Sequence, residues 1–484
     1  MRKTPRAALV TLDPSVATPL YRQIYDRIGA GIASGALRPG DRLPSARNLA
    51  AQLGTARGTV DAAYAMLQGE GYVVSRVPAG TIVSPELALR ALAQSGSRPK
   101  RGGASGTSLV GSARIEAPLI STPFFRLGVP ALDAFPRTLW SRLVTRRARA
   151  LAPARMIYPD PIGIPELRQA IANYLRVSRG ISCSSHQVFI TNGYQEALAL
   201  FARALLHPGD PIWFEDPGYP QARDGLEGAG ATLVPVRVDA EGICVSEGVA
   251  QAPNARFVVV TPSHQSPLGV PLSLPRRLSL LTWARETGAW IIEDDYDGEF
   301  RYVGRPLPAL KSLDRDERVL YGGSFSKVLF PDLRLGYLVV PEALVAPFAQ
   351  ACRALNAGHS SFEQHIVADF MTEGHFARHL KRMRNLYSSR RRALANGLAA
   401  VFGNRLSVEL EDGGMHLIAR LRRGVRDTEL ARRAWSGGLA VEALSTRAKA
   451  YPCGSALLLG FTNIPENEVL IHCRHLDRLI GKWL

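Results

Sequence analysis

Short β-rich segments alternate with helical segments over most of this 484-residue chain, from about residue 121 onward. Seven segments are expected strands: HQVFITNG, PIWFED, ATLVPVRVD, ARFVVVTP, AWIIEDD, RVLYGGS and RLGYLVVP. Helical segments such as GYQEALALFARALL and PRRLSLLTWARETG separate several of them. Continuous apolar runs such as FVVV and WII are typical of strands that are buried on both faces. The pattern therefore predicts an α/β domain with a mostly parallel sheet.

Polar residues follow two of these strands, at the edge of the sheet where ligands of such folds collect. The segment FITNGYQEAL runs through Asn192 and Gly193 into a helix, whose free N–H groups favour an anion such as phosphate. The segment WIIEDDYD places Glu293, Asp294 and Asp295 at a buried strand end. Buried carboxylates are costly unless they meet a cation, a metal or a protonated ring nitrogen. No histidine lies close by in the sequence, which gives a metal site little support.

A lysine among apolar and small residues follows another strand. The stretch YGGSFSKVLF contains Ser324, Ser326 and Lys327, and Arg334 follows seven residues later. Two hydroxyls, an arginine and a helix N-terminus together favour a phosphorylated ligand. A desolvated lysine amine beside them is available for carbonyl chemistry.

The N-terminal segment predicts three helices and a hairpin. Leu20, Ile24, Ile28 and Ile32 are four apart, as on one face of an amphipathic helix. The segment LPSARNLAAQLG predicts a short helix with Ser45 as N-cap, and TARGTVDAAYAMLQGEG predicts a third helix with Thr55 as N-cap. YVVSRVPAGTIV then predicts two strands around a turn. This order is that of a winged helix-turn-helix, an α+β fold.

In such a module the helix after the turn presents its N-terminal side chains to the major groove of DNA. Side chains of the two later helices and of the wing are therefore the candidates for DNA contact: Arg47, Arg57, Gly58, Thr59, Arg76 and Gly80. The alternative is a small helical domain that packs on another protein. The outward arginines favour double-stranded DNA.

The charge distribution agrees with a polyanionic partner. The formal net charge is +17, and residues 1–120 hold 15 Lys+Arg against 7 Asp+Glu. The excess per residue is about three times denser there than in the remainder, which favours nucleic acid. A GC-rich coding sequence, in which arginine is frequent throughout, would give a similar total, so charge alone leaves both interpretations open.

We expect three parts along the chain: a winged domain over residues 1–84, a flexible linker over 85–120 and a large module over 121–484. The large module divides at about residues 150–375 and 376–484. In the linker, SGSRPKRGGASGTSLVGSAR has no apolar period, although its Lys100 and Arg101 could touch DNA phosphates. The basic stretch HFARHLKRMRNLYSSRRR, with seven cations, is expected to form the solvated face of a long helix.

Five scattered cysteines without a CxxC pair argue against a disulfide framework. No apolar run approaches the length of about 20 residues that a membrane helix needs, and no signal peptide is recognised. These features favour a cytoplasmic protein without a membrane anchor.

Two stretches resemble known families. LRPGDRLPSARNLAAQLGTARGTVDAAYAMLQGEGYV is similar to the DNA-binding domain of GntR-family regulators. The SFSK lysine followed by an arginine resembles fold-type I pyridoxal-phosphate (PLP) enzymes of the aminotransferase class. TPSHQSPLG, EDDYDGEFRY and GSFSKVLFPDLRLGY, in this order behind a GntR-like domain, resemble the MocR/GabR-type bacterial regulators over nearly the whole chain.

The resemblance implies roles for individual residues. Lys327 would form the Schiff base with PLP, Asp294 would pair with the pyridinium nitrogen, and Tyr296 would hydrogen-bond the ring hydroxyl. Tyr219 would stack on the ring, and Asp295 would replace Asp294 if the strand register were shifted by one. The implied phosphate-binding residues are Gly193, Tyr194, Ser324, Ser326 and Arg334.

Several positions depart from the family pattern. Gln221 stands where the GABA-responsive relatives have an arginine that grips a carboxylate, and Arg223 lies two residues further on. Leu457–Leu459 occupy a late strand in which aminotransferases often carry an arginine, and Arg447 is a candidate substitute. Ser266 replaces an expected phenylalanine. These departures leave the effector open between PLP itself and a small amine or amino acid.

The leading hypothesis is a PLP-dependent transcriptional regulator, in which the aminotransferase-like domain senses PLP or an amine and controls operator binding. The resemblance implies a head-to-tail homodimer. The alternative is an active PLP-dependent aminotransferase that carries a DNA-binding domain, and a third hypothesis is a DNA-binding protein whose second domain binds no cofactor.

Overall fold

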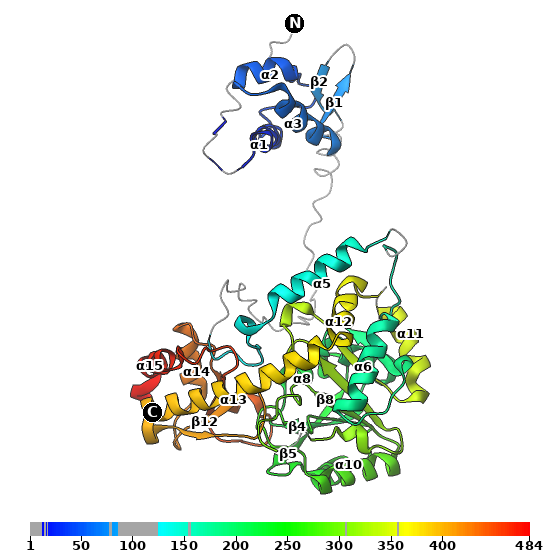
Figure 1. The fold of residues 1–484 in the computed structure, drawn as a ribbon, viewed down its shortest axis with the longest axis vertical. Helices are drawn as coiled ribbons and strands as arrows, with labels where there is room; N and C mark the ends of the chain where they lie inside the picture. Colours follow the sequence, from blue (N-terminus) through cyan, green and yellow to red (C-terminus); the bar gives the residue numbers. More distant parts are fainter. Residues whose placement is uncertain are drawn as a thin grey trace, which may run out of the picture. The chain divides into compact units, whose positions relative to one another are not determined.

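The chain forms two compact units, Met1–Glu116 and Ala117–Leu484, in a computed structural model (Figure 1). The structure describes residues 12–13, 16, 18–76, 80–85, 124–152, 156–304, 307–355 and 358–484. The expected linker after Pro85, with Lys100 and Arg101, lies outside the described residues, as do the tip of the wing and the side chain of Arg76. Within the described residues, no helix combines the length and apolarity needed to cross a bilayer.

The N-terminal unit is a winged helix-turn-helix, as its apolar spacing predicts. Its elements are α1 (Leu20–Ala33), α2 (Ala46–Leu53), α3 (Arg57–Gly69), β1 (Val73–Arg76) and β2 (Gly80–Val83). Ile24 and Ile28 of α1 are buried against Val60 and Leu67 of α3 and the two strands. The strands pair antiparallel.

The ends of α2 follow the prediction and the start of α3 does not. Ser45 accepts a hydrogen bond from the backbone N–H of Asn48 at 3.2 Å, and Gly54 ends the helix in a left-handed conformation at φ 62°. The prediction of Thr55 as N-cap of α3 is wrong, because Ala56 holds that position and no side chain caps the helix. The first-turn N–H groups of α3 therefore have no side-chain cap.

The second unit is built on an eight-stranded sheet with the order β3-β10-β9-β8-β7-β4-β5-β6. Its strands are β3 (Val188–Thr191), β4 (Pro211–Asp216), β5 (Thr232–Asp239), β6 (Gly242–Ile243), β7 (Phe257–Val260), β8 (Trp290–Asp295), β9 (Val319–Ser324) and β10 (Gly336–Val339). The pairs β4–β5, β4–β7, β7–β8 and β8–β9 are parallel. The mostly parallel sheet is thus confirmed.

Strand β10 is antiparallel to both of its neighbours, β3 and β9. The connection from Ser324 to Gly336 contains only the short 3-10 helix η5 (Pro331–Leu333), so β10 returns beside β9 in the opposite direction. The apolar residues of β10 follow the pattern of a buried parallel strand, so this pattern does not reveal that the strand is antiparallel. The direction of β10 is set by the short connection. As a result β3, β4, β8 and β9 all run the same way and their carboxyl ends share one edge.

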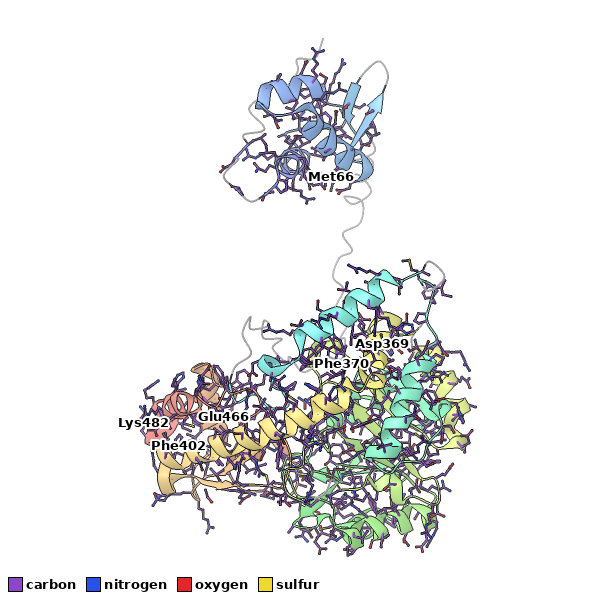
Figure 2. The ribbon with its side chains drawn as sticks, in the orientation of Figure 1. Met66, Asp369, Phe370, Phe402, Glu466 and Lys482 are labelled. Atoms are coloured by element: carbon purple, nitrogen blue, oxygen red, sulfur yellow. The ribbon has the colours of Figure 1, made fainter. Side chains whose placement is uncertain are left out.

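Helices cover both faces of the sheet (Figure 1). They are α5 (Arg137–Arg149), α6 (Pro165–Ser178), α7 (Tyr194–Leu205), α8 (Pro220–Gly228), α9 (Val245–Gln251), α10 (Leu274–Thr287), α11 (Val345–Leu355) and α12 (Ser361–Thr372). Arg146 and Arg147 of α5 form ion pairs with Asp369 of α12, which lies beside Phe370 (Figure 2). These ion pairs hold α5 against α12.

A smaller subdomain follows the long helix α13 (His375–Phe402). Its antiparallel sheet has the order β11-β12-β14-β13, with strands β11 (Ser407–Glu409), β12 (His416–Arg420), β13 (Glu442–Ala443) and β14 (Ala456–Gly460). Helices α14 (Asp427–Ser436) and α15 (Val469–Ile480) and the 3-10 helix η8 (Leu444–Arg447) complete it.

The basic stretch on α13 is only partly solvated. Arg390 and Arg391 are buried, against the expectation of a solvated face. Arg390 pairs with Asp133 and donates to the carbonyl of Thr462 at 2.6 Å, whereas Arg391 lies over the ring of Tyr302. The partners of Arg390 and Arg391 are remote in sequence, so the basic stretch by itself does not predict that these two arginines are buried.

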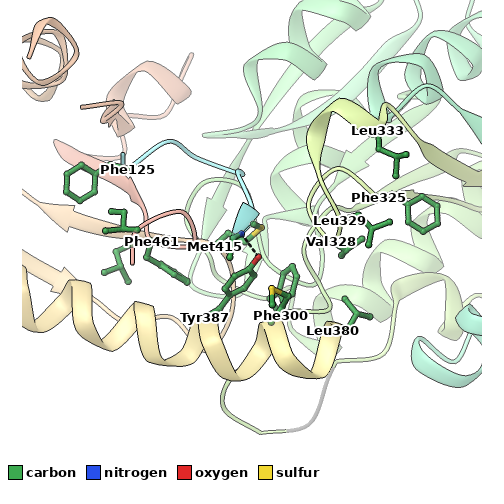
Figure 3. Close-up of a cluster of buried hydrophobic side chains, with 14 of the residues drawn as sticks. Phe125, Phe300, Phe325, Val328, Leu329, Leu333, Leu380, Tyr387, Met415 and Phe461 are labelled. Atoms are coloured by element: carbon green, nitrogen blue, oxygen red, sulfur yellow. Dashed lines mark hydrogen bonds between the residues drawn. The ribbon is translucent and has the colours of Figure 1, made fainter. Parts of the chain in front are cut away.

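A cluster of apolar side chains underlies the loop that carries the expected cofactor lysine (Figure 3). Phe325, Val328 and Leu329 flank Lys327 and are buried beside Leu380 of α13. The Tyr387 hydroxyl of α13 accepts the backbone N–H of Ala131 at 3.0 Å. The apolar neighbours of Lys327 thus bury the loop, and the Lys327 amine is directed away from them.

Candidate functional site

A cavity of about 390 Å³ opens at the shared edge where β3, β4, β8 and β9 end. All of the residues expected to bind PLP line it: Gly193, Tyr194, Tyr219, Asp294, Tyr296, Ser324, Ser326, Lys327 and Arg334. They come from segments up to 141 residues apart, between Gly193 and Arg334. The sheet brings them together because its parallel strands deliver their carboxyl ends to one edge.

One end of the cavity is suited to an anion. Gly193 precedes the first turn of α7 with φ 89°, so that turn exposes its backbone N–H groups. The Arg334 guanidinium donates to the carbonyl of Asn192 at 3.0 Å, and a Cβ added to Gly193 would lie 3.6 Å from it. Arg334 itself holds a left-handed conformation at φ 46°, which costs a non-glycine residue energy and is often found at functional sites.

Lys327 lines the cavity. Its Nζ donates to the carbonyl of Gly128 at 3.1 Å. Burial lowers the pKa of the Lys327 amine, and the nearby carboxylates of Asp297 and Asp294 oppose that change. A lowered pKa increases the fraction of neutral amine, which is the form that attacks a carbonyl carbon.

Gly128 is a residue of the cavity that the sequence analysis missed. Its φ is 66°, and a Cβ at this position would lie 2.3 Å from Nζ of Lys327. The two residues are 199 positions apart in the sequence, so no local sequence pattern predicts their contact. Only glycine leaves the room that the lysine amine occupies.

The two adjacent carboxylates of β8 face opposite sides of the sheet. Asp294 lines the cavity, whereas Asp295 pairs with the buried Arg179 and accepts the Tyr321 hydroxyl at 2.5 Å. The alternative that Asp295 takes the place of Asp294 is therefore wrong, because side chains alternate along a strand. Burial raises the pKa of Asp294 well above its usual range, and the neighbouring Asp295 raises it further. A cation bound beside Asp294 would relieve this cost.

The Tyr296 hydroxyl has a partner that the sequence analysis also missed. It lies 2.9 Å from Nδ1 of His264, which is in turn 3.2 Å from Asp297. These side chains come from the loop after β7 and the end of β8, and Ser266 lines the cavity nearby. The chain of contacts fixes the orientation of Tyr296 toward the cavity.

The positions that depart from the family pattern fall into two groups. Gln221 and Arg447 line the cavity, whereas Arg223 borders a separate small hollow beside Asp216 and Lys449. The leucines at 457–459 are fully buried in β14. His416 also lines the cavity, with its Nε2 2.9 Å from the carbonyl of Pro267.

In the N-terminal unit, the candidate DNA-binding residues lie at the start of α3 and near it. Arg47 of α2, Arg57 and Gly58 of α3 and Gly80 of β2 are exposed, and Thr59 is half-buried. Arg42 is a further cation here, since its guanidinium lies 3.4 Å from the position of a Cβ on Gly80. Exposed arginines at a helix N-terminus suit contacts with base edges and phosphates.

The cavity fits a phosphorylated pyridinium aldehyde. Its volume lies within the range of about 300–1,000 Å³ for small-molecule sites. It combines an anion site, a buried carboxylate that needs a cation, and an amine of lowered pKa between them. Residues that could hold the phosphate are therefore separate from those that could hold the ring.

Two different family models match the two units of the chain. The model for bacterial regulatory proteins of the gntR family matches residues 20–83, and the model for aminotransferase class I and II matches residues 131–455.

Known regulators match nearly the whole chain. It is 39% identical to the probable rhizopine catabolism regulatory protein MocR of Rhizobium meliloti, over 94% of this chain and 92% of that protein. It is 33% identical to the HTH-type pyridoxine biosynthesis transcriptional regulator PdxR of Corynebacterium glutamicum, over 95% and 96%.

Solved aminotransferases resemble the second unit. The kynurenine aminotransferase of Pyrococcus horikoshii, solved in complex with PMP, is 26% identical with a TM-score of 0.68, covering 75% of this chain and 92% of that one. The α-aminoadipate aminotransferase LysN of Thermus thermophilus, complexed with N-(5'-phosphopyridoxyl)-L-leucine, is 27% identical with a TM-score of 0.68, over 74% and 92%.

Proposed function

The chain belongs to the MocR-type transcriptional regulators of the GntR family, which join a helix-turn-helix DNA-binding domain to an aminotransferase class I domain, and on this premise we propose that PLP bound at Lys327 controls its binding to operator DNA. The observation that supports this most is that one cavity brings Lys327 together with the eight other residues expected to bind the cofactor. Operator binding would place the protein in the cytoplasm.

Several residues of the cavity have a task toward the cofactor in this proposal. Arg334, Ser324, Ser326 and the N–H groups of the first turn of α7 would bind the phosphate. Asp294 would hold the proton on the ring nitrogen. When bound, PLP supplies an aldehyde carbon that condenses with primary amines.

The remaining residues orient the ring and the amine. Tyr296 donates to the ring hydroxyl and is held in place by His264. Tyr219 covers the ring. The Gly128 carbonyl accepts a hydrogen bond from Nζ of Lys327 and keeps Nζ within the cavity.

A regulatory role is favoured over turnover. Gln221 stands where the GABA-responsive relatives have an arginine that grips a carboxylate, and the buried leucines of β14 occupy a late strand in which aminotransferases often carry an arginine. An amine that reaches the cofactor would act as a signal if it binds one conformation of the protein better than the other. Steady transamination at rates typical of enzymes would overturn this proposal in favour of the active aminotransferase.

A homodimer is part of the proposal. Met156, Ile157 and Tyr158 are consecutive and 65%, 73% and 87% exposed, in a unit that otherwise buries most large apolar side chains. Exposed apolar residues that cluster in this way mark interaction surfaces. We assign this segment to contact with a second copy of the chain, in the head-to-tail arrangement that the family resemblance implies.

Visible absorption of the purified protein with PLP tests the cofactor assignment. Covalent attachment to Lys327 should give a band at the edge of the visible range, and Lys327→Ala should abolish it. Lys381→Ala, which removes an exposed lysine of α13, is the matched control and should keep the band. A full band in the Lys327→Ala protein, with circular dichroism showing an intact fold, would contradict the assignment.

A further inference from the structure

His264 is a buried histidine whose Nδ1 faces two oxygens at once. This nitrogen lies 2.9 Å from the Tyr296 hydroxyl and 3.2 Å from Oδ2 of Asp297, and both His264 and Asp297 are buried. An ionised carboxylate at this distance holds a proton on Nδ1, because two lone pairs would otherwise face each other. The Nδ1–H group is then shared between the Asp297 and Tyr296 oxygens. The Tyr296 hydroxyl keeps its own proton free for an acceptor in the cofactor cavity.

The Nε2 edge of the same ring faces the small subdomain. A Cβ on Gly414 would overlap the ring, so the backbone at this position packs directly on His264. A Cβ on Gly269 would lie 3.1 Å from Nε2 and 2.6 Å from Cγ of Glu411, which places the Glu411 side chain beside Nε2. A cavity of about 30 Å³ is lined by His264, Asp297 and Glu411. One carboxylate from each subdomain therefore adjoins the imidazole.

Residues 411–414, here called the seam segment, join β11 to β12 and are fastened to the chain that follows β8. The Tyr302 hydroxyl donates to the carbonyl of Gly414 at 2.5 Å. Arg301 forms an ion pair with Asp412 at 2.8 Å. The seam segment is thus fixed to the large subdomain only a few residues beyond the end of the strand that carries the cofactor-binding carboxylate.

The charges around His264 favour its charged form. Burial alone would lower the pKa of His264, but the carboxylates of Asp297 and Glu411 outweigh burial and raise the pKa. Arg301 opposes this rise, and its ion pair with Asp412 offsets part of its charge. Burial raises the pKa of Glu411, and the charge of His264 counteracts that rise. The imidazole and the seam-segment carboxylate therefore favour each other's charged form.

Two further titratable groups face His264, and both are uncharged at neutral pH. The ring of His416 lies 5.7 Å from that of His264, and burial together with the charge of His264 lowers the pKa of His416 to about 4. Burial raises the pKa of Tyr296 well above its usual value, so the hydroxyl keeps its proton. The positive charge of this group of rings thus belongs to His264.

We propose that His264 is a positioning residue for the cofactor ring, that Asp297 and Glu411 keep its imidazole charged, and that the charged imidazole makes Tyr296 a proton donor to the ring oxygen. This inference rests on the proposed PLP site and specifies how the protein controls the charge on the ring. Because Glu411 belongs to the seam segment, the seating of the small subdomain on the large one affects this hydrogen bond directly.

The pH dependence of the visible band in the PLP-loaded protein tests the role of His264. The nitrogen that joins Lys327 to PLP shares its proton with the ring oxygen, and a second donor at that oxygen favours loss of the shared proton. His264→Gln should therefore raise the pH at which the band changes by about 0.5 unit or more. Circular dichroism checks that the variant is folded. An unchanged transition in a folded, PLP-loaded His264→Gln protein would overturn the proposal.

Glu411→Gln distinguishes this mechanism from a direct effect of charge on the linkage. Direct loss of a negative charge would lower the pH of the transition, whereas loss of the charge on His264 raises it. We expect a shift in the same direction as that of His264→Gln. Glu409→Gln is the matched control and should cause no shift, since Glu409 lies two residues earlier and pairs with Arg420 at 3.3 Å. A shift of Glu411→Gln to lower pH, or no shift, would contradict the proposal.

Nuclear magnetic resonance of the histidine rings in the PLP-free protein tests the charge without the cofactor. At neutral pH we expect one ring protonated on both nitrogens whose signals are lost in His264→Gln, and whose titration moves to lower pH in Glu411→Gln. A neutral His264 in the wild-type protein would contradict this inference and leave the cofactor assignment intact. A charged His264 in a protein that shows no PLP band would mean that the cofactor assignment alone is wrong.

Discussion

At the scale of single residues, the position of the Lys327 amine depends on the residues that contact it. The sequence marks Lys327 through its serines and apolar neighbours, and the structure adds the carbonyl of Gly128 as the acceptor at 3.1 Å. Gly128 and His264 could not be predicted, because each acts through a partner that is remote in the chain. The choice between Asp294 and Asp295 likewise required the register of β8, which a run of three acidic residues does not reveal.

Gly128→Ala tests this contact. The added Cβ would lie 2.3 Å from Nζ, in a backbone conformation that alanine rarely adopts, so the lysine must leave its position. We expect the visible PLP band to be lost or strongly reduced. Gly209→Ala, also at positive φ but with open space around it, controls for backbone strain and should keep the band. Normal PLP uptake by Gly128→Ala would show that this contact is dispensable.

At the scale of elements, the strands were easier to predict than their directions. All seven expected segments form strands, since runs such as Phe257–Val260 combine β-branched residues with burial on both faces. The antiparallel direction of β10 and the burial of Arg390 within a basic helix depend on connections and partners outside each segment. In the N-terminal unit, apolar spacing predicted the three helices, whereas the cap of α3 was misassigned.

Arg57→Ala tests the assignment of α3 as the DNA-reading helix. Its side chain is 72% exposed, and its ion pair with Asp61 one turn later is of the kind that adds little stability. A base contact by arginine is worth about 1–3 kcal/mol, so operator affinity should fall roughly 10-fold or more while PLP uptake is unchanged. Arg22→Ala, which breaks a similar pair with Asp26 on α1, is the matched control. Loss of both activities would mean that the substitution unfolds the protein.

At the scale of the whole molecule, the chain forms two compact units, one with a GntR-type DNA-binding domain and the other with an aminotransferase class I domain. The family assignment could be predicted from the order of motifs along the chain, because each motif belongs to a site that the fold must assemble. The effector could not be predicted from the sequence, because Arg126, Glu442 and Arg447 line one cavity only after the two subdomains have packed together. Communication between the units requires that the ligand and DNA each favour one conformation over another: the same conformation if the ligand strengthens DNA binding, and different ones if it weakens it.

Operator affinity measured by fluorescence anisotropy tests the central claim most directly, with the intergenic DNA next to the gene as the probe. The wild-type protein is compared without PLP, with PLP, and with PLP plus 4-aminobutanoate or 2-aminoethanesulfonate, beside Lys327→Ala in the same states. We predict that the dissociation constant of the wild-type protein changes by about 5-fold or more between states, and that Lys327→Ala does not respond. One affinity for wild-type protein in every state, or the same response in Lys327→Ala, would contradict the account.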